Sequence, residues 1–98
     1  MYTPIELDKT RNLRYGMLAI SKIEKKFKKT ISKIDFEDLS MEDTATIIWA
    51  GLVHEDSKLT PEKVMQLVDD HSNIKDVVET MGKAFQDSMG GGIEEEKN

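Results

Sequence analysis

Two histidines stand directly beside acidic residues, in the stretches His54-Glu55-Asp56 and Asp69-Asp70-His71. An imidazole next to carboxylates is a combination that binds a metal ion or transfers a proton. Both stretches fall at predicted helix ends, where consecutive side chains point about 100° apart and do not converge on one ion. We therefore interpret both as solvated helix ends, and we expect no metal site and no catalytic base.

Other catalytic groups are scarce in the sequence. The chain has no cysteine, and so it has no thiol nucleophile, thiolate metal ligand or disulfide. Its glycine-rich stretch, Gly90 to Gly92, follows a predicted helix instead of joining a strand to a helix, a context that does not suit a phosphate-binding loop. We predict a protein that is not an enzyme, has no cofactor and acts by binding.

The length and composition suit one soluble domain. A chain of 98 residues can bury a single modest core. Hydrophobic residues make up 38% of it and charged residues 34%, and no apolar run approaches the roughly 18 residues of a membrane span. Residues 2–12 mix charges into the region where a signal peptide would be apolar. We expect a cytoplasmic protein that does not bind membranes.

The net charge of -5 is unevenly distributed. Six lysines lie between Lys22 and Lys33, whereas the stretch from Asp35 to Asp43 carries five acids and no base. The simplest interpretation of the lysines is a solvated helix face. Nucleic-acid contact is disfavoured because this run has no arginine and one aromatic residue, Phe27. Weak, salt-dependent self-association of the basic stretch with the acidic stretch of another copy is a further alternative.

Four segments have the pattern of helices. The second is predicted to start at the N-cap Ser40 and reach Val53 or His54, and the third to run from Thr60 and Pro61 to His71. The fourth opens at Ser72 or Asn73 and stops at Gly90. The first covers about Lys9 to Lys29, and its inward face comprises Leu13, Met17, Ile20, Ile23 and Phe27.

These segments predict an all-α fold, a small bundle of about four helices. Residues 1–89 are expected to form a single helical domain and residues 90–98 a flexible tail rich in glycine and acids. A short extended segment is possible at residues 2–7, where Pro4 would restrict it to an edge. Glu24 falls near the middle of the first helix's inward face, and we expect it to pair with Lys28 at the rim.

The second helix contains the run IIWAGLV and is apolar on nearly every side, so it is either buried all round or meets a partner. Gly51 is unfavourable in mid-helix, which predicts close approach of another backbone there. A chain of this size can hardly bury such a helix completely as well as Phe27, Phe85 and four internal methionines, so we expect some of this surface to be left for a partner. Two strips are candidate partner-binding residues: Ile47, Trp49 and Val53 in this helix, and Met81, Phe85 and Met89 in the fourth.

The sequence resembles the tail assembly chaperones of long-tailed bacteriophages, prophages and gene transfer agents. The resemblance lies in three runs, NLRYGMLAISKIEKKF, TIIWAGLVHEDSKLTPEKVMQLVDD and VVETMGKAFQDSMG. The matching features are the Leu13-Arg14 start, Glu24, the WAGL run at Trp49 to Leu52, and the LT.E.V helix start at Leu59. The Lys-rich first helix and the short lead-in before Asn12 depart from the family pattern.

The resemblance implies a protein that binds the long, hydrophobic, helical tape measure protein and keeps it soluble during tail tube assembly. It implies further that the tail tube protein is a possible second partner, and that the chaperone works in the host cytoplasm and is not retained in the mature virion. The residue composition is compatible, since the six methionines supply side chains that repack against varied apolar partners. The alternative function is a small helical nucleic-acid-binding regulator that uses the lysines of the first helix.

Overall fold

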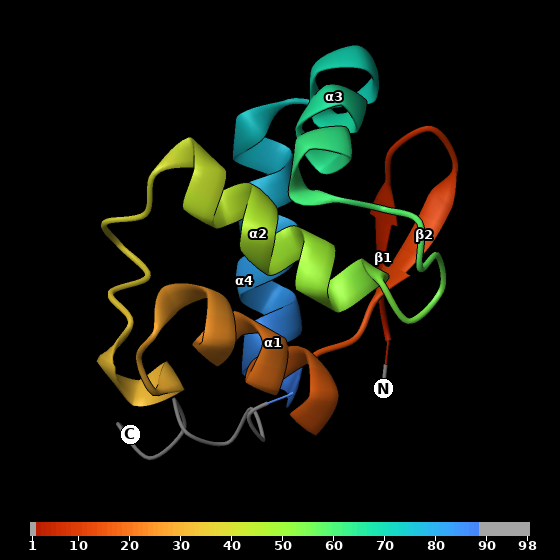
Figure 1. Cartoon of the computed structure of the whole chain (residues 1–98). Helices are drawn as coiled ribbons and strands as arrows, with labels where there is room; N and C mark the ends of the chain where they lie inside the picture. The colour runs from red at the N-terminus through yellow and green to blue at the C-terminus, as the bar shows by residue number, and fades with distance from the viewer. Residues whose placement is uncertain (1, 89–98) are drawn as a thin grey trace, which may run out of the picture.

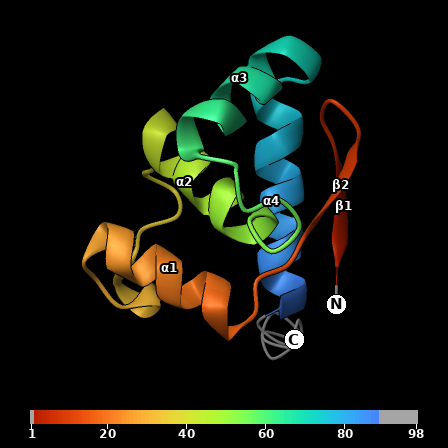
Figure 2. The same ribbon diagram turned by 45° about the vertical axis from the view of Figure 1, so that its right-hand side comes forward.

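The computed structural model describes residues 2–88 and is mostly helical, with one β-hairpin (Figure 1). Helix α2 crosses in front of α4, and α1 lies below it in this view. Turning the molecule shows α4 between the hairpin and the other three helices (Figure 2). In chain order the elements are β1 (Thr3–Glu6), β2 (Thr10–Leu13), α1 (Met17–Phe27), the 3-10 helix η1 (Ile31–Lys33), α2 (Met41–Leu52), α3 (Pro61–His71) and α4 (Ile74–Ser88).

The hairpin corrects the prediction of a purely α-helical fold. Strands β1 and β2 pair antiparallel, with Thr3 opposite Leu13 and Glu6 opposite Thr10. The extended segment expected at residues 2–7 is therefore present as β1, but residues 10–13 form its partner strand and not the first turns of a helix. The buried side chains of β2 alternate, Arg11 and Leu13 pointing inward. The sequence did not predict this strand, because a charged residue such as Arg11 is normally expected to face solvent and so hides the alternation of buried and exposed side chains.

Helix α1 is shorter than predicted, and its first turn faces solvent. It begins at Met17 and ends at Phe27, after which Lys28 adopts a left-handed conformation with φ of 59°. Its buried residues are Ala19 and Ile23, while Met17, which was expected to face inward, is 89% exposed. The prediction was wrong here because it continued the helical period back to Leu13, which lies in a strand.

Glu24 also differs from expectation. Its carboxylate accepts a hydrogen bond of 2.8 Å from the backbone N–H of Ile31. The predicted pair with Lys28 is therefore replaced by a bond that holds η1 against the end of α1. A partly buried carboxylate satisfied in this way avoids the cost of an unpaired charge.

The N-termini of α2 and α3 agree with the predicted capping pattern. The Ser40 hydroxyl accepts a 3.0 Å bond from the Asp43 N–H, and the Thr60 hydroxyl accepts one of 3.1 Å from the Lys63 N–H. Pro61 occupies the start of α3, which ends at His71 as predicted. The remaining predicted end, Gly90 after the fourth helix, and the tail of residues 90–98 lie outside the described part of the chain.

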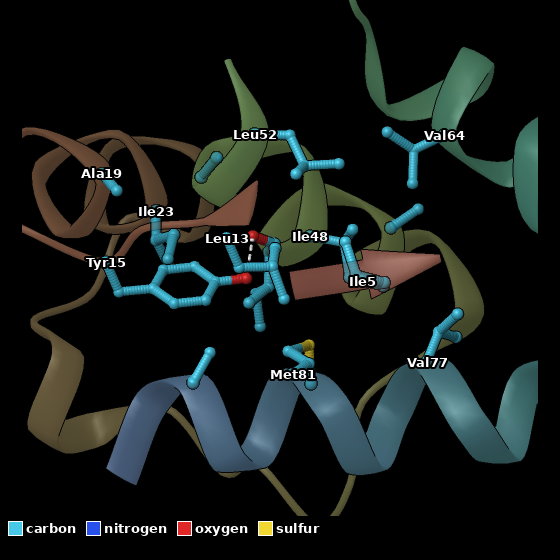
Figure 3. Close-up of a cluster of buried hydrophobic side chains, with 14 of the residues drawn as sticks. Ile5, Leu13, Tyr15, Ala19, Ile23, Ile48, Leu52, Val64, Val77 and Met81 are labelled. Atoms are coloured by element: carbon cyan, nitrogen blue, oxygen red, sulfur yellow. Dashed lines mark hydrogen bonds between the residues drawn. The ribbon is translucent and has the colours of Figure 1, made fainter. Parts of the chain in front are cut away.

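Helix α2 lies at the centre of the core, which confirms the interpretation of its apolar run as mostly buried. It packs against α1, α3 and β2. Figure 3 shows side chains from the hairpin and from all four α-helices meeting in one cluster, with Leu13 and Ile48 near its centre. The buried residues of α2 are Thr44, Ala45, Ile47, Ile48, Ala50, Gly51 and Leu52.

Tyr15 joins the link between β2 and α1 to α2. Tyr15 is 3% exposed, and its hydroxyl donates a 2.8 Å hydrogen bond to the Ile47 carbonyl (Figure 3). Burial raises the pKa of this phenol well above its ordinary value. The predicted close approach at Gly51 is confirmed, because the Arg14 N–H donates to the Gly51 carbonyl at 2.9 Å. A Cβ at Gly51 would also meet the Tyr15 ring at 2.7 Å.

Within residues 2–88, no helix is long and apolar enough to cross a membrane.

Candidate partner-binding surface

The predicted contact residues do not form one surface. Ile47 is fully buried and Met81 is 4% exposed, so both belong to the core and cannot reach a partner in this structure. Trp49 on α2, Val53 at the C-cap of α2 and Phe85 on α4 are half-buried. Met89 lies outside the described residues. Of the predicted contact residues that the structure describes, Trp49, Val53 and Phe85 therefore have surface that a partner can touch.

Trp49 fastens α2 to the loop that precedes α3. Its indole Nε1 donates a 2.9 Å hydrogen bond to the Leu59 carbonyl. The Lys26 ammonium lies 5.5 Å from the centroid of the Trp49 ring, within range of a cation–π interaction. These contacts give Trp49 a structural role across α1, α2 and the α3 loop.

Phe85 belongs to an aromatic cluster near the end of α4. Its ring stacks on Tyr15 with centroids 4.3 Å apart and meets Phe36 at 5.0 Å in a tilted arrangement. Such offset or tilted pairs are the favoured geometries of aromatic rings. The cluster fixes the end of α4 beside the link that leads into α1.

A groove lies between the start of α1 and the end of α2, and we call it the α1–α2 groove. Its volume is about 570 Å³. Val53 is the one predicted contact residue in its lining. The groove is lined by Arg14, Gly16, Met17, Leu18, Ala19 and Lys22 on one side, and by Ala50, Val53, His54 and Ser57 on the other.

Met17 and Leu18 make this groove unusual. They are 89% and 82% exposed, more than any other large apolar side chains among the described residues. Because Ala19 and Ile23 point inward, the side chains just before Ala19 are carried around the helix to its outer side. A contiguous exposed apolar patch beside a hollow is a typical mark of a protein-binding site.

The groove has a basic rim. Arg14 and Lys22 line it, and no carboxylate does among the residues that the structure describes. Tyr2 extends this rim, since its ring lies 5.8 Å from the Arg14 guanidinium carbon and 5.6 Å from the His54 ring. The groove therefore combines apolar contact with positive charge.

His54 is held in place at the rim by the hairpin. Its Nε2 lies 2.8 Å from the Asn12 carbonyl, and because a carbonyl only accepts, Nε2 carries the hydrogen. Glu55 supports the same loop by accepting hydrogen bonds from the Asn12 backbone N–H and side-chain amide, the second of which chiefly lowers the Glu55 pKa. The His54-Glu55-Asp56 stretch thus connects the end of α2 to the hairpin.

A second hollow of about 230 Å³ lies among α2, α3 and α4. Its walls are apolar, with Ile48 and Val77 deep in it and Asp69 as the single charged residue of its lining. Met41 and Ile74 at this hollow are each about half-exposed, far less than Met17 and Leu18. It is the weaker of the two candidate surfaces.

The buried Arg11 beneath the hairpin loop has a structural role. It pairs with Asp8 at 2.9 Å and with Asp56 at 3.4 Å. The hydrogen bond from Arg11 holds the pKa of Asp8 below its usual value. These are the salt bridges among residues 2–88, so the lysines of α1 form none with the described part of the chain.

Sequence reasoning missed Met17 and Leu18 as surface residues. A signal was nevertheless present, because two adjacent apolar residues in a helix point about 100° apart and cannot both lie on a narrow inward face. The chain matches no protein-family model, no curated protein and no solved structure. Functional proposals for it therefore depend on the surface chemistry and on the sequence resemblance.

Proposed function

We propose that this protein is a tail assembly chaperone that binds a hydrophobic tape measure protein through the α1–α2 groove. The observation that carries the proposal is the pair Met17 and Leu18, both highly exposed at a hollow of about 570 Å³. Exposed apolar side chains of this size lower solubility unless a partner covers them. The sequence resemblance supplies the class of partner.

The chemistry of the groove suits a helical client. An amphipathic helix binds a groove by inserting apolar side chains spaced one turn apart. Met17 and Leu18 can contact such anchors, and the small Ala19 and Ala50 leave space between α1 and α2. The flexible thioether of Met17 can adjust to different anchors along a long client. In this proposal the chaperone acts in the host cytoplasm, makes no catalytic step and leaves before the virion is complete.

The test is co-expression with a tape measure protein from the same genome, followed by measurement of the soluble fraction of that protein and of the affinity of the purified complex. The double variant Met17→Asp/Leu18→Asp should weaken binding at least about tenfold, since charges would replace two apolar contacts. Ile74→Asp is the matched control, because Ile74 is a half-exposed apolar residue at the second hollow.

The control should bind like the wild type, and urea unfolding should show that all variants are folded. If the Met17→Asp/Leu18→Asp variant still binds the client and Ile74→Asp does not, the client-binding site is the second hollow. A tape measure protein that stays equally soluble without the chaperone would overturn the function itself.

Nucleic-acid binding is the second candidate function, and one observation favours it. All six lysines from Lys22 to Lys33 are exposed, on α1 and the segment that follows it. A gel shift with unrelated DNA at low and moderate salt tests it, because phosphate contacts weaken steeply as salt rises. The absence of any shift at low salt would remove this candidate.

Self-association between copies is a compatible proposal. Four of the five acids from Asp35 to Asp43 are exposed, and they follow the exposed lysines in the chain. Head-to-tail contact between these stretches would be screened by salt. Sedimentation at low and high salt tests it, and an unchanged monomer in both conditions would dismiss it.

A further inference from the structure

The apolar part and the basic part of the α1–α2 groove lie along one strip of α1. Leu18, Lys22 and Lys26 follow one another at steps of four residues, and residues four apart are neighbours on a helix surface. Leu18 and Lys22 line the groove. The Lys26 ammonium lies 5.5 Å from the centroid of the Trp49 ring on α2. The strip therefore runs from an apolar end at Leu18 to a basic end beside Trp49, in steps of about 6 Å.

The lysines of this strip have no acidic partner in the part of the chain that the structure describes. Lys22 and Lys26 are exposed, and neither forms a salt bridge among residues 2–88. Glu24, the one acid of α1, accepts a hydrogen bond from the first backbone N–H of η1 instead. Glu55, which follows the groove residue His54, accepts hydrogen bonds from the hairpin. The strip is therefore free to attract carboxylates from a partner.

The net charge of the whole chain, -5, does not oppose this local attraction at ordinary salt. At an ionic strength of about 0.15 M the screening length is about 8 Å, so a bound charge responds mainly to groups within about one and a half helix turns. Arg14 and Lys22 line the groove, and no carboxylate lines it among residues 2–88. The groove therefore favours an acidic partner although the chain as a whole is acidic.

We propose that the segment that binds in the α1–α2 groove is an amphipathic helix with carboxylates one turn away from its apolar anchors. The anchors pack on Met17, Leu18 and Val53, and the carboxylates face Lys22 and Lys26. This inference rests on the proposed function only for the identity of the client, and it adds which segments of a tape measure protein bind. A segment that is equally apolar but carries lysines at those positions is repelled by the strip.

Three synthetic helical peptides test this chemistry on the full chain. Each peptide has an alanine-rich body and two leucines four residues apart, so that both leucines fall on one face. The first has glutamate four residues before the first leucine and four residues after the second, which serves either direction of binding. The second has glutamine at both places and the third has lysine. NMR titration measures each affinity from the shifts of the Met17 and Leu18 methyl signals.

The glutamate peptide should bind about threefold to tenfold more tightly than the glutamine peptide, because an exposed ion pair is worth at most about fivefold and two such pairs form. The lysine peptide should bind most weakly. Met17→Ser/Leu18→Ser removes the apolar contact without adding charge, and it should weaken all three peptides. Equal affinities of the three peptides, or no shift of the Met17 and Leu18 signals with any of them, would overturn the proposal.

Lys22→Glu reverses the charge in the middle of the strip. This variant should bind the glutamate peptide about threefold to tenfold more weakly and the lysine peptide more tightly. Lys75→Glu is the matched control, because Lys75 is exposed at the start of α4 and does not line the groove. It changes the net charge equally and should alter each affinity by less than about twofold. If both variants change the affinities alike, the preference comes from net charge and the assignment to the groove is wrong.

Duplex DNA is titrated in the same way, because phosphates are also attracted to lysines. If DNA shifts the Met17 and Leu18 signals and the glutamate peptide does not, the strip binds phosphate and the proposed partner is wrong. The expected result is that DNA leaves these apolar methyl groups unshifted.

Binding of the tape measure protein separates this inference from the proposed function. Lys22→Glu should weaken that binding as it weakens binding of the glutamate peptide. If the glutamate peptide is preferred but the tape measure protein does not bind, the groove chemistry is right and the chaperone function is wrong. If the tape measure protein binds through Met17 and Leu18 with the same affinity in Lys22→Glu, the chaperone function is right and the acidic segment is wrong.

Discussion

Tyr15 and Met17 stand two residues apart and meet opposite environments. Tyr15 is 3% exposed, hydrogen-bonded to α2 and stacked on α4, whereas Met17 is 89% exposed at the start of α1. Both are large and largely apolar, so residue type alone does not separate them. The backbone separates them, because the extended link places Tyr15 under α2 and the first turn of α1 then carries Met17 outward.

This difference divides the segment into an anchor and a presented surface. Tyr15 and Gly51 fix where α1 begins, through the close ring contact and the Arg14 bond to the Gly51 carbonyl. Once the start of α1 is fixed, the positions of Met17 and Leu18 are fixed as well, although neither side chain is buried in the core. Changes at the anchor should therefore cost stability, and changes at the surface should cost binding.

The largest effect is expected from Tyr15→Ala. Removing a buried aromatic side chain costs about 3 to 5 kcal/mol, and here the bond to the Ile47 carbonyl and the stack on Phe85 are lost as well. Leu18→Ala, three residues away and exposed, should change the free energy of unfolding by less than about 0.5 kcal/mol. Urea unfolding measures both. If the two variants lose similar amounts of unfolding free energy, the assignment of Tyr15 as an anchor and Leu18 as a surface residue is wrong.

Gly51→Ala should be the next most harmful change. Alanine is the better helix former by about 1 kcal/mol, yet its Cβ would lie 2.7 Å from Cζ of the Tyr15 ring. We expect the clash to prevail and to destabilise the protein by about 1 to 3 kcal/mol. In a Tyr15→Leu background, which removes the phenol ring, the same substitution should become neutral or stabilising. A cost that is equal in both backgrounds would show that Tyr15 is not what requires glycine.

Trp49→Phe probes a residue between the two extremes, half-buried and bonded to the Leu59 carbonyl. Phenylalanine keeps most of the ring contact and removes the donor, so a loss of about 0.5 to 1.5 kcal/mol is expected, as for a typical hydrogen bond. The urea midpoint measures it. Unchanged stability together with weaker client binding would assign Trp49 to the partner surface instead.

The helices were largely predictable from local signals. Ser40, Thr60 and Pro61 mark helix starts by their own chemistry, and α2 and α3 begin where these residues predict. The hairpin was not predictable in the same way. Arg11 is buried there because Asp8 and Asp56 neutralise it, and Asp56 lies 45 residues away in the chain. A pattern of apolar residues cannot reveal such a distant pair.

The candidate surface was predictable only in part. Val53, one of the predicted contact residues, lines the α1–α2 groove, whereas Ile47 and Met81 are core residues. An apolar helix in a small chain offers more candidates than its surface can hold, and tertiary packing decides which remain exposed. The error at Met17 has the same origin as the missed hairpin, since a helix drawn from Lys9 gives the wrong rotation at residue 17.

The smallest effect is expected at Glu55, which connects the anchor to the groove by holding Asn12 beside His54. Hydrogen bonds from Asn12 lower the pKa of this carboxyl below its usual 4.5, so the charged form favours the folded state. This contribution is complete above pH 4.5 and is lost as the pH falls through the lower folded-state pKa. Because the site is exposed, the contribution should stay below about 1 kcal/mol.

Glu55→Gln tests this contribution. Wild type should be slightly more stable than the variant at pH 7, and the difference should shrink as the pH is lowered from about 5 to 3, the range around the ordinary carboxyl pKa. Both proteins should still weaken in acid, because the pKa values of Asp8 and Asp56 are lowered as well. Urea midpoints across this pH range measure the effect. A stability difference between wild type and Glu55→Gln that does not change with pH would show that the charge of Glu55 does not contribute to the stability of the folded state.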